Sequence, residues 1–240
     1  MKTVGILGGM GPEATLLLYE LIIKNTGAKS DQEHVPTLIY SNTRIPDRTA
    51  AILSQGEDPV PELIKAAKAL EAGGAEIIGM PCNTAHYYFD EVQGAVEVEM
   101  INMLELAYRK VLEGQLGKRI ALFATTGTIA TGIYDFGKRH PGISIDTPGE
   151  EAQRIIMKTI YEEVKAGKRP MDVDDYRALL LRVEEQGFEG IILGCTELSY
   201  LHTVFKFHQN VEFINPLELL AMELIRRARA DTGKRKENAK

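Results

Sequence analysis

What this sequence lacks excludes several classes of protein. No apolar run reaches the roughly 18 residues that a membrane-spanning helix needs, and no signal-peptide pattern is present. We therefore expect a cytoplasmic protein with no membrane partner. Basic residues are in the minority, with 28 Lys and Arg against 34 Asp and Glu and a net charge of −6. This balance argues against a nucleic-acid partner.

Metal and nucleotide motifs are missing as well. The 5 histidines and 2 cysteines show no metal-ligand spacing, so we expect no metal site. The glycine-rich stretch LGGMGP (residues 7–12) lacks both G-x-G-x-x-G and the Lys-Ser/Thr of a P-loop. We interpret it as a loop whose backbone approaches a small anion at a helix N-terminus, with Met10 in the binding segment. A tight strand-to-helix turn would also explain its glycines.

The chain has only 2 cysteines, and they occur in similar stretches of sequence. Cys82 lies in IIGMPCNTAH (77–86) and Cys195 in IILGCTELSY (191–200). In a cytoplasmic chain two cysteines are more often free thiols than a disulfide. A redox pair would normally have the C-x-x-C spacing, so the wide separation of these two argues against a thiol redox protein.

Short apolar segments alternate with helical patterns along most of the chain. We expect strands at 3–7, 37–41, 76–80 and 98–102. Helices are expected at 12–27, where Pro12 stands early and Gly27 stops the pattern, and at 61–74. Apolar strands separated by helices are typical of parallel sheets that carry helices on both faces.

Three blocks of sequence recur in the same order. KTVGILGGMGPEAT (2–15) matches KRIALFATTGTIAT (118–131), GGAEIIGMPC matches GFEGIILGC, and VEMINMLEL (98–106) matches VEFINPLEL (211–219). Their order and nearly constant spacing indicate an internal duplication. We predict an α/β fold of two similar, pseudo-symmetric domains, residues 1–102 and 103–215, each with a mostly parallel sheet of roughly four strands. The segment 231–240 is expected to be a frayed tail.

The duplication places the two cysteines at the carboxyl ends of equivalent strands. Two similar domains commonly pack about a pseudo-two-fold axis, and ligands of open α/β sheets bind at this edge, so both thiols can face one cleft. One thiol can then remove a proton from a carbon while the other returns a proton to its opposite face, as a racemase requires. Each cysteine begins a turn into a helix, with Asn83 or Thr84 and Thr196 as N-cap candidates, which favours the thiolate.

The stretches GILGGMGPEAT, PCNTAH and GCTEL resemble the signatures of the aspartate/glutamate racemases, and most of all those of aspartate racemases, from residue 4 to about residue 228. The resemblance implies an isomerase that needs no cofactor, with Cys82 and Cys195 as its catalytic acid–base pair. It also implies a homodimer and a last helix, 216–230, that returns to the first domain. It does not fix the substrate, so glutamate or broad-specificity racemases, or a dicarboxylate-binding protein of this fold, remain alternatives.

An acidic amino acid as substrate would need cationic anchors. Arg48, in SNTRIPDRT (41–49), can hold a carboxylate in a bidentate fork, and the resemblance implies this role. Lys165 is a looser match, because Lys158 and Lys168 lie nearby. TTGT (125–128) is the second-half counterpart of the glycine-rich loop. The other candidates for substrate contacts are Thr49, Asn83, Thr84, Thr125, Thr126, Gly127 and Thr196.

Two further side chains lie close to the cysteines in sequence. His86 follows Cys82 at i+4, as in a Cys–His nucleophile pair, but we interpret it as a structural histidine. Glu197 follows Cys195 at i+2 and has two equally good interpretations. It either keeps the Cys195 thiol protonated by like-charge repulsion or favours the dipole of its helix.

Overall fold

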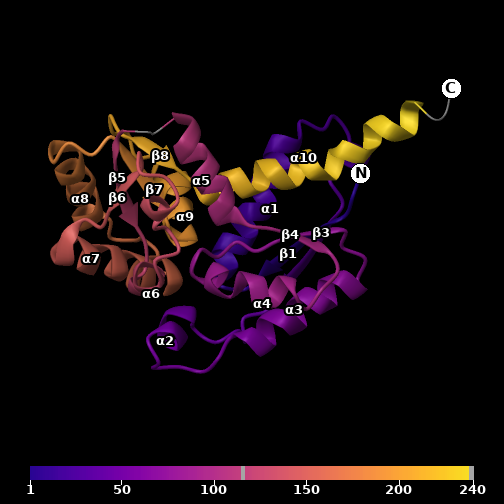
Figure 1. The fold of residues 1–240 in the computed structure, drawn as a ribbon, viewed down its shortest axis with the longest axis horizontal. Helices are drawn as coiled ribbons and strands as arrows, with labels where there is room; N and C mark the ends of the chain where they lie inside the picture. The colour runs from indigo at the N-terminus through magenta and orange to yellow at the C-terminus, as the bar shows by residue number, and fades with distance from the viewer. Residues whose placement is uncertain (115–116, 238–240) are drawn as a thin grey trace.

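Two four-stranded parallel sheets, with the same strand order, organise the residues that the computed structural model describes, 1–114 and 117–237 (Figure 1). The first sheet has the order β2-β1-β3-β4 and the second β6-β5-β7-β8, so each strand has a counterpart at the same place in the other half. The strands are β1 (Val4–Gly8), β2 (Thr37–Ser41), β3 (Ile77–Gly79), β4 (Glu99–Ile101), β5 (Arg119–Phe123), β6 (Ser144–Asp146), β7 (Gly190–Leu193) and β8 (Glu212–Ile214). The predicted α/β fold with two similar halves is confirmed.

Helices connect the strands and cover the sheets. Every strand pairing is parallel, so each connection must cross back over the sheet. Two predicted helices form where expected: α1 has Pro12 in its first turn and ends at Gly27 with φ 63°, and α3 ends at Gly73. The helices are α1 (Pro12–Thr26), α2 (Arg48–Ile52), α3 (Val60–Ala72), α4 (Phe89–Gln93), α5 (Met103–Gly114), α6 (Thr126–Thr131), α7 (Gly149–Lys158), α8 (Asp174–Glu185), α9 (Thr196–Phe205) and α10 (Pro216–Glu237), with short turns η1 (Asp31–Glu33), η2 (Thr84–Tyr88), η3 (Phe136–Lys138) and the π-helix η4 (Thr159–Lys165).

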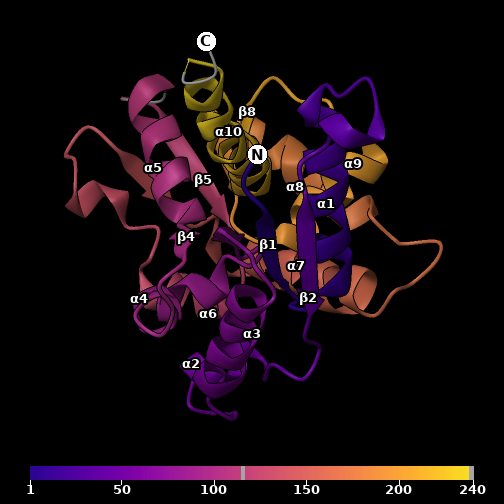
Figure 2. The same cartoon turned by 90° about the vertical axis from the view of Figure 1, so that its right-hand side faces the viewer.

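The last helix, α10, packs against the first sheet. Leu220 and Leu224 share a buried cluster with Val4 and Ile6 of β1. Gly79 of β3 admits the helix, because a Cβ at this position would lie 2.7 Å from Leu224 Cδ1. The amino terminus lies beside α10 in both views (Figures 1 and 2), and the Lys2 N–H donates to the Ala228 carbonyl at 2.9 Å.

These contacts bear on the domain boundaries. We propose that residues 1–102 and α10 form a discontinuous first domain and that residues 103–215 form the second. In support, Leu104, Ala107 and Val111 of α5 pack in one cluster with Ile120 and Leu122 of β5.

The last helix is longer than predicted. The chain is helical to Glu237, past the predicted helix end at residue 230, and residues 238–240 of the expected tail lie outside the described residues.

Replacing Leu224 by alanine tests this assignment. Leu224 is 0% exposed, so Leu224→Ala should lower the free energy of unfolding by about 3 kcal/mol through lost burial and a cavity. Met222, 52% exposed on the same helix, is the control, and Met222→Ala should change stability by less than about 0.5 kcal/mol. Urea unfolding measures both values. Equal losses in the two variants would contradict the packing of α10 on the first sheet.

Candidate active site

The two cysteines line one narrow space between the halves. Cys82 follows β3, and Cys195 follows β7 as the N-cap residue of α9. Both are free thiols, 6% and 5% exposed, and they share this inner space with side chains from both halves. The inner space is lined by Met10, Asp47, Arg48, Thr49, Cys82, Asn83, Thr84, Thr125, Tyr161, Lys165, Cys195, Thr196 and Glu197.

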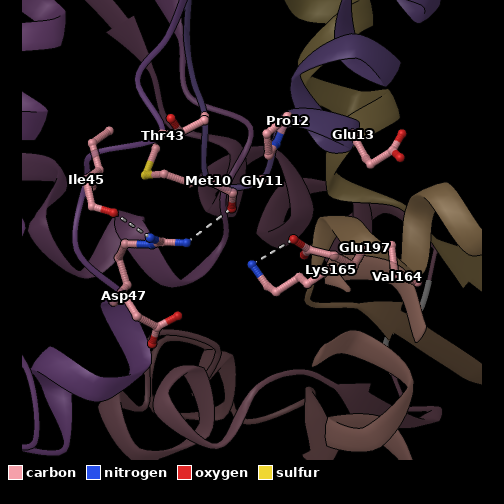
Figure 3. Close-up of a pocket in the computed structure, with 12 residues that line it drawn as sticks. Met10, Gly11, Pro12, Glu13, Thr43, Ile45, Asp47, Val164, Lys165 and Glu197 are labelled. Carbon is pink, nitrogen blue, oxygen red and sulfur yellow. Dashed lines mark hydrogen bonds and ion pairs between the residues drawn. The ribbon is translucent and has the colours of Figure 1, made fainter. Parts of the chain in front are cut away.

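An outer pocket adjoins the inner space. The outer pocket has a volume of about 390 Å³, whereas the inner space has about 10 Å³. That is the room that one water molecule occupies, so the inner space as it stands does not hold an amino acid. Figure 3 shows Lys165 and Glu197 on one side of the outer pocket and Met10, Ile45 and Asp47 on the other.

Arg48, the first residue of α2, is held on the first half. Its side chain donates from Nη1 to the carbonyls of Ile45 at 3.3 Å and Pro46 at 2.8 Å, and from Nη2 to that of Met10 at 3.3 Å. Its Nε is buried and has no hydrogen-bond partner among the described residues. Burial lowers the pKa of the guanidinium, but attraction to Cys82 and then to Asp47 raises it above its usual value. Arg48 is therefore a fixed cation with an unused donor.

Asn83 carries a second unused donor. Its side chain is 2% exposed, and Oδ1 accepts a hydrogen bond at 2.5 Å from the hydroxyl of Tyr134 in the other half. That bond fixes the amide orientation, and Nδ2 is left without a partner among the residues described. Burial raises the pKa of Tyr134 well above its usual value, so its hydroxyl stays a donor.

Lys165, Glu197 and Cys195 form a connected chain on the second half. Lys165 Nζ lies 2.9 Å from Glu197 Oε1, and the Cys195 thiol donates to Glu197 Oε2 at 2.9 Å. Burial raises the pKa of Glu197, but Lys165 and the bond from Cys195 lower it overall, so the carboxylate is ionised. Burial and then Glu197 raise the pKa of Cys195 well above its usual value, although Lys165 opposes this. Burial lowers the pKa of Lys165, but attraction to Glu197 and then to Cys195 together raises it above its usual value.

The expectation that a helix N-terminus favours the thiolate does not hold at Cys195, where burial and then the adjacent carboxylate favour the protonated thiol. The predicted caps also differ. The N-cap of α9 is Cys195 rather than Thr196, whose hydroxyl donates to the Pro81 carbonyl at 3.4 Å, and Asn83 precedes η2 without a capping bond.

The predicted threonines contact one another across the halves. Thr49 donates to Thr125 at 3.2 Å, and Thr84 lies 3.2 Å from Thr125 and 2.7 Å from Thr128, hydroxyl to hydroxyl. Thr49 and Thr84 belong to the first half, and Thr125 and Thr128 to the second. These four residues form the threonine cluster, and their mutual bonds indicate that they join the halves.

Two predicted substrate contacts are not brought to the cysteines. Thr126 and Gly127 line neither the inner space nor the outer pocket. The Thr126 N–H contacts Met157 Sδ at 3.4 Å, on the side of α7. Gly127 is where α6 meets α2, since a Cβ there would lie 2.8 Å from Thr49 Cα. The glycine serves close approach of the halves, and the substrate contacts of both residues stay predictions.

Sequence reasoning missed Tyr161 and did not single out Asp47. The Tyr161 hydroxyl donates to Asp47 Oδ2 at 3.2 Å across the cleft, and burial raises the pKa of Tyr161 to about 12. Asp47 also caps α2 by accepting from the Ala50 N–H at 2.8 Å. Its place beside Arg48 in a polar loop was a usable signal, whereas nothing in the helical pattern around Tyr161 marked that residue.

His86 has the structural role that we expected. Its Nε2 accepts from the Met103 N–H at 3.2 Å, which leaves Nδ1 to donate to the Cys82 carbonyl at 2.8 Å. The ring thus bonds to backbone on both sides, and burial lowers its pKa to about 4.

Among the described residues, no cluster of three or more His, Cys, Asp or Glu is placed to hold a metal ion. The helices described there include none that is long and apolar enough to cross a membrane.

Comparison with known proteins gives a consistent result. The Asp/Glu/Hydantoin racemase family model matches residues 7–224. The broad specificity amino-acid racemase RacX of Bacillus subtilis is 29% identical over 209 residues, which cover 82% of this chain and 86% of RacX. An aspartate racemase from Picrophilus torridus superposes with a TM-score of 0.78 at 32% identity, covering 95% of this chain and 94% of that one. An aspartate racemase homologue from Pyrococcus horikoshii gives a TM-score of 0.72 at 30% identity, covering 95% of this chain and 99% of that one. Because the family match extends over most of the sequence and the duplicated fold agrees with it, this chain belongs to the Asp/Glu/Hydantoin racemase family and is an isomerase of the racemase type.

Proposed function

We propose that this racemase interconverts L- and D-aspartate without a cofactor, with Cys82 and Cys195 as its acid–base pair. One observation carries the proposal: the two thiols, from equivalent strand ends, line one buried space between two fixed cations, Arg48 and Lys165. The similarity to the aspartate racemase of Picrophilus torridus supports the choice of substrate.

The reaction needs only two proton transfers. A thiolate on one face takes the α-proton of the amino acid, and the electron pair stays on the α-carbon, delocalised into its carboxylate. The thiol on the opposite face then gives its proton to that carbon, so the configuration inverts and the two sulfurs exchange protonation states. Each cysteine is therefore the base for one enantiomer and the acid for the other.

The unused donors of the inner space favour a carboxylate ligand. Arg48 Nε and Asn83 Nδ2 are buried N–H groups without partners among the described residues. A buried donor left unpaired costs about 1–3 kcal/mol, so a ligand that accepts from both recovers that free energy. Arg48 offers a charge-assisted bond to one carboxylate of aspartate, and Lys165 on the opposite wall can attract the other.

A racemase of glutamate or of a broader set of amino acids is the second candidate. It is favoured by the similarity to RacX and by the ion pair of Lys165 with Glu197, which satisfies the lysine without a second substrate carboxylate. Racemisation assays across L- and D-amino acids decide between the two. A protein that only bound dicarboxylates would exchange no α-proton.

The cytoplasmic location and the homodimer stay predictions. Light scattering, which measures the mass of the protein in solution, tests the homodimer.

The paired thiols predict complementary defects. Cys82→Ala and Cys195→Ala should each abolish racemisation, because inversion needs an acid and a base on opposite faces. Each variant keeps one base, so each should still exchange the α-proton of one enantiomer with solvent, and the two should prefer opposite enantiomers. Proton NMR of L- and D-aspartate in D₂O measures this exchange. Racemisation at the wild-type rate in either variant would show that its missing cysteine is structural.

The proposed bond from Arg48 to a substrate carboxylate predicts how much catalysis is lost when the guanidinium is removed. Arg48→Ala should lower kcat/KM for aspartate by the equivalent of about 2–3 kcal/mol. Arg48→Lys should not restore it, because lysine lacks the planar fork. Arg44→Ala, at an exposed position of the same loop, is the matched control and should leave kcat/KM unchanged. If Arg48→Ala behaves like the control, with unchanged thermal stability, the guanidinium does not bind substrate.

A further inference from the structure

The duplicated site is symmetric in its backbone and asymmetric in charge. Cys82 and Cys195 follow equivalent strands, β3 and β7, at the same place in the two sheets. The residue two positions after the first cysteine is Thr84, whose hydroxyl bonds to the threonine cluster. The residue two positions after the second cysteine is Glu197, whose carboxylate bonds to the thiol itself. The two thiols therefore have different local partners.

The contacts of Glu197 determine where the proton lies. Its side chain is 3% exposed, with Oε1 2.9 Å from Lys165 Nζ and Oε2 2.9 Å from Cys195 Sγ. Lys165 keeps the carboxylate ionised, and an ionised carboxylate only accepts hydrogen bonds. The short contact to sulfur is thus a bond donated by the thiol, and it requires a proton on Cys195.

We propose that Glu197 is a positioning residue that keeps the proton on Cys195 in the resting enzyme, so that Cys195 starts the cycle as the acid and Cys82 as the base. This inference rests on the proposed two-thiol racemisation. After Cys195 donates its proton, its thiolate faces the Glu197 carboxylate, and like-charge repulsion drives Cys195 to take a proton again. The two protonation states of the free enzyme are therefore unequal in energy, although the scaffold is nearly symmetric.

The other groups that face Cys195 do not reverse this bias. Lys165, from η4, lowers the thiol pKa, while Cys82, from the opposite half, raises it. Tyr161, from η4, and Tyr134, which precedes η3, both have pKa values raised by burial and stay neutral. With burial and Glu197 on the same side, the balance favours the protonated thiol.

The titration of a single thiol tests the proposal. The chain has 2 cysteines, so Cys82→Ala leaves only Cys195, and ¹³Cβ-labelled cysteine then gives one NMR signal that reports thiol against thiolate. In the Cys82→Ala background, adding Glu197→Gln should lower the titration midpoint by about one pH unit or more. The reason is that a repelling charge is removed and Lys165 is left to attract the thiolate.

Glu163→Gln in the same background is the matched control. Glu163 is also a buried carboxylate, 2% exposed and paired with Lys168 at 2.7 Å, but it lines neither the inner space nor the outer pocket. Replacing Glu163 should leave the titration midpoint of Cys195 unchanged, even if the loss of a buried carboxylate lowers stability in both variants. The same midpoint with Glu197 and with Gln at this position would overturn the proposal.

A racemisation assay separates this inference from the proposed function. Enantiomers have equal free energies, so kcat/KM must be the same in both directions for any variant. In the two-cysteine enzyme, Glu197→Gln should therefore change kcat and KM unequally for L- and D-aspartate while the ratios stay equal. A shifted midpoint with no racemisation by the wild type refutes the proposed function alone. Racemisation by the wild type with an unshifted midpoint refutes the role of Glu197 alone.

Discussion

A charge removed from water must find its partner inside the protein, and the cleft of this racemase is arranged around that requirement. Arg48 and Glu197 are 7% and 3% exposed, and each is fixed by several contacts. Three backbone carbonyls hold the guanidinium, and Lys165 balances the carboxylate. Because these charges are already held in place, they would need little rearrangement in the proposed reaction, when charge develops on the α-carbon.

The duplication supplies a scaffold suited to chemistry on two faces of one carbon. Equivalent strands deliver a thiol from each half to one inner space, as the proposed two-thiol racemisation requires. The halves have diverged in the charges beside those sulfurs. Arg48 attracts Cys82 on one side, and the ion pair of Lys165 and Glu197 adjoins Cys195 on the other. The two thiols thus have equivalent positions and unequal surroundings, which is the basis of the different starting roles that we propose for them.

The contacts between the two halves leave little room at the thiols. In the closed arrangement the inner space has about 10 Å³, and the threonine cluster and the bond from Tyr161 to Asp47 join its walls. These contacts are hydrogen bonds of polar side chains, which water replaces at modest cost when the halves separate. In the proposed reaction, closure over the substrate would remove water from the charged groups around the reacting carbon and so strengthen their interactions with it.

The sequence by itself determined the duplication, the parallel sheets and the pair of cysteines. Strand β2 formed at the predicted residues, and each recurring block reached the same place in its half, because apolar periodicity and turn residues act over short stretches of chain. Tertiary structure alone decided the protonation of Cys195, the absence of Thr126 and Gly127 from the lining of the inner space, and the meeting of Tyr161 with Asp47. A pKa depends on burial and on charges a few ångströms away, which come from segments far apart in the chain. Only the packing of the two halves brings those segments together.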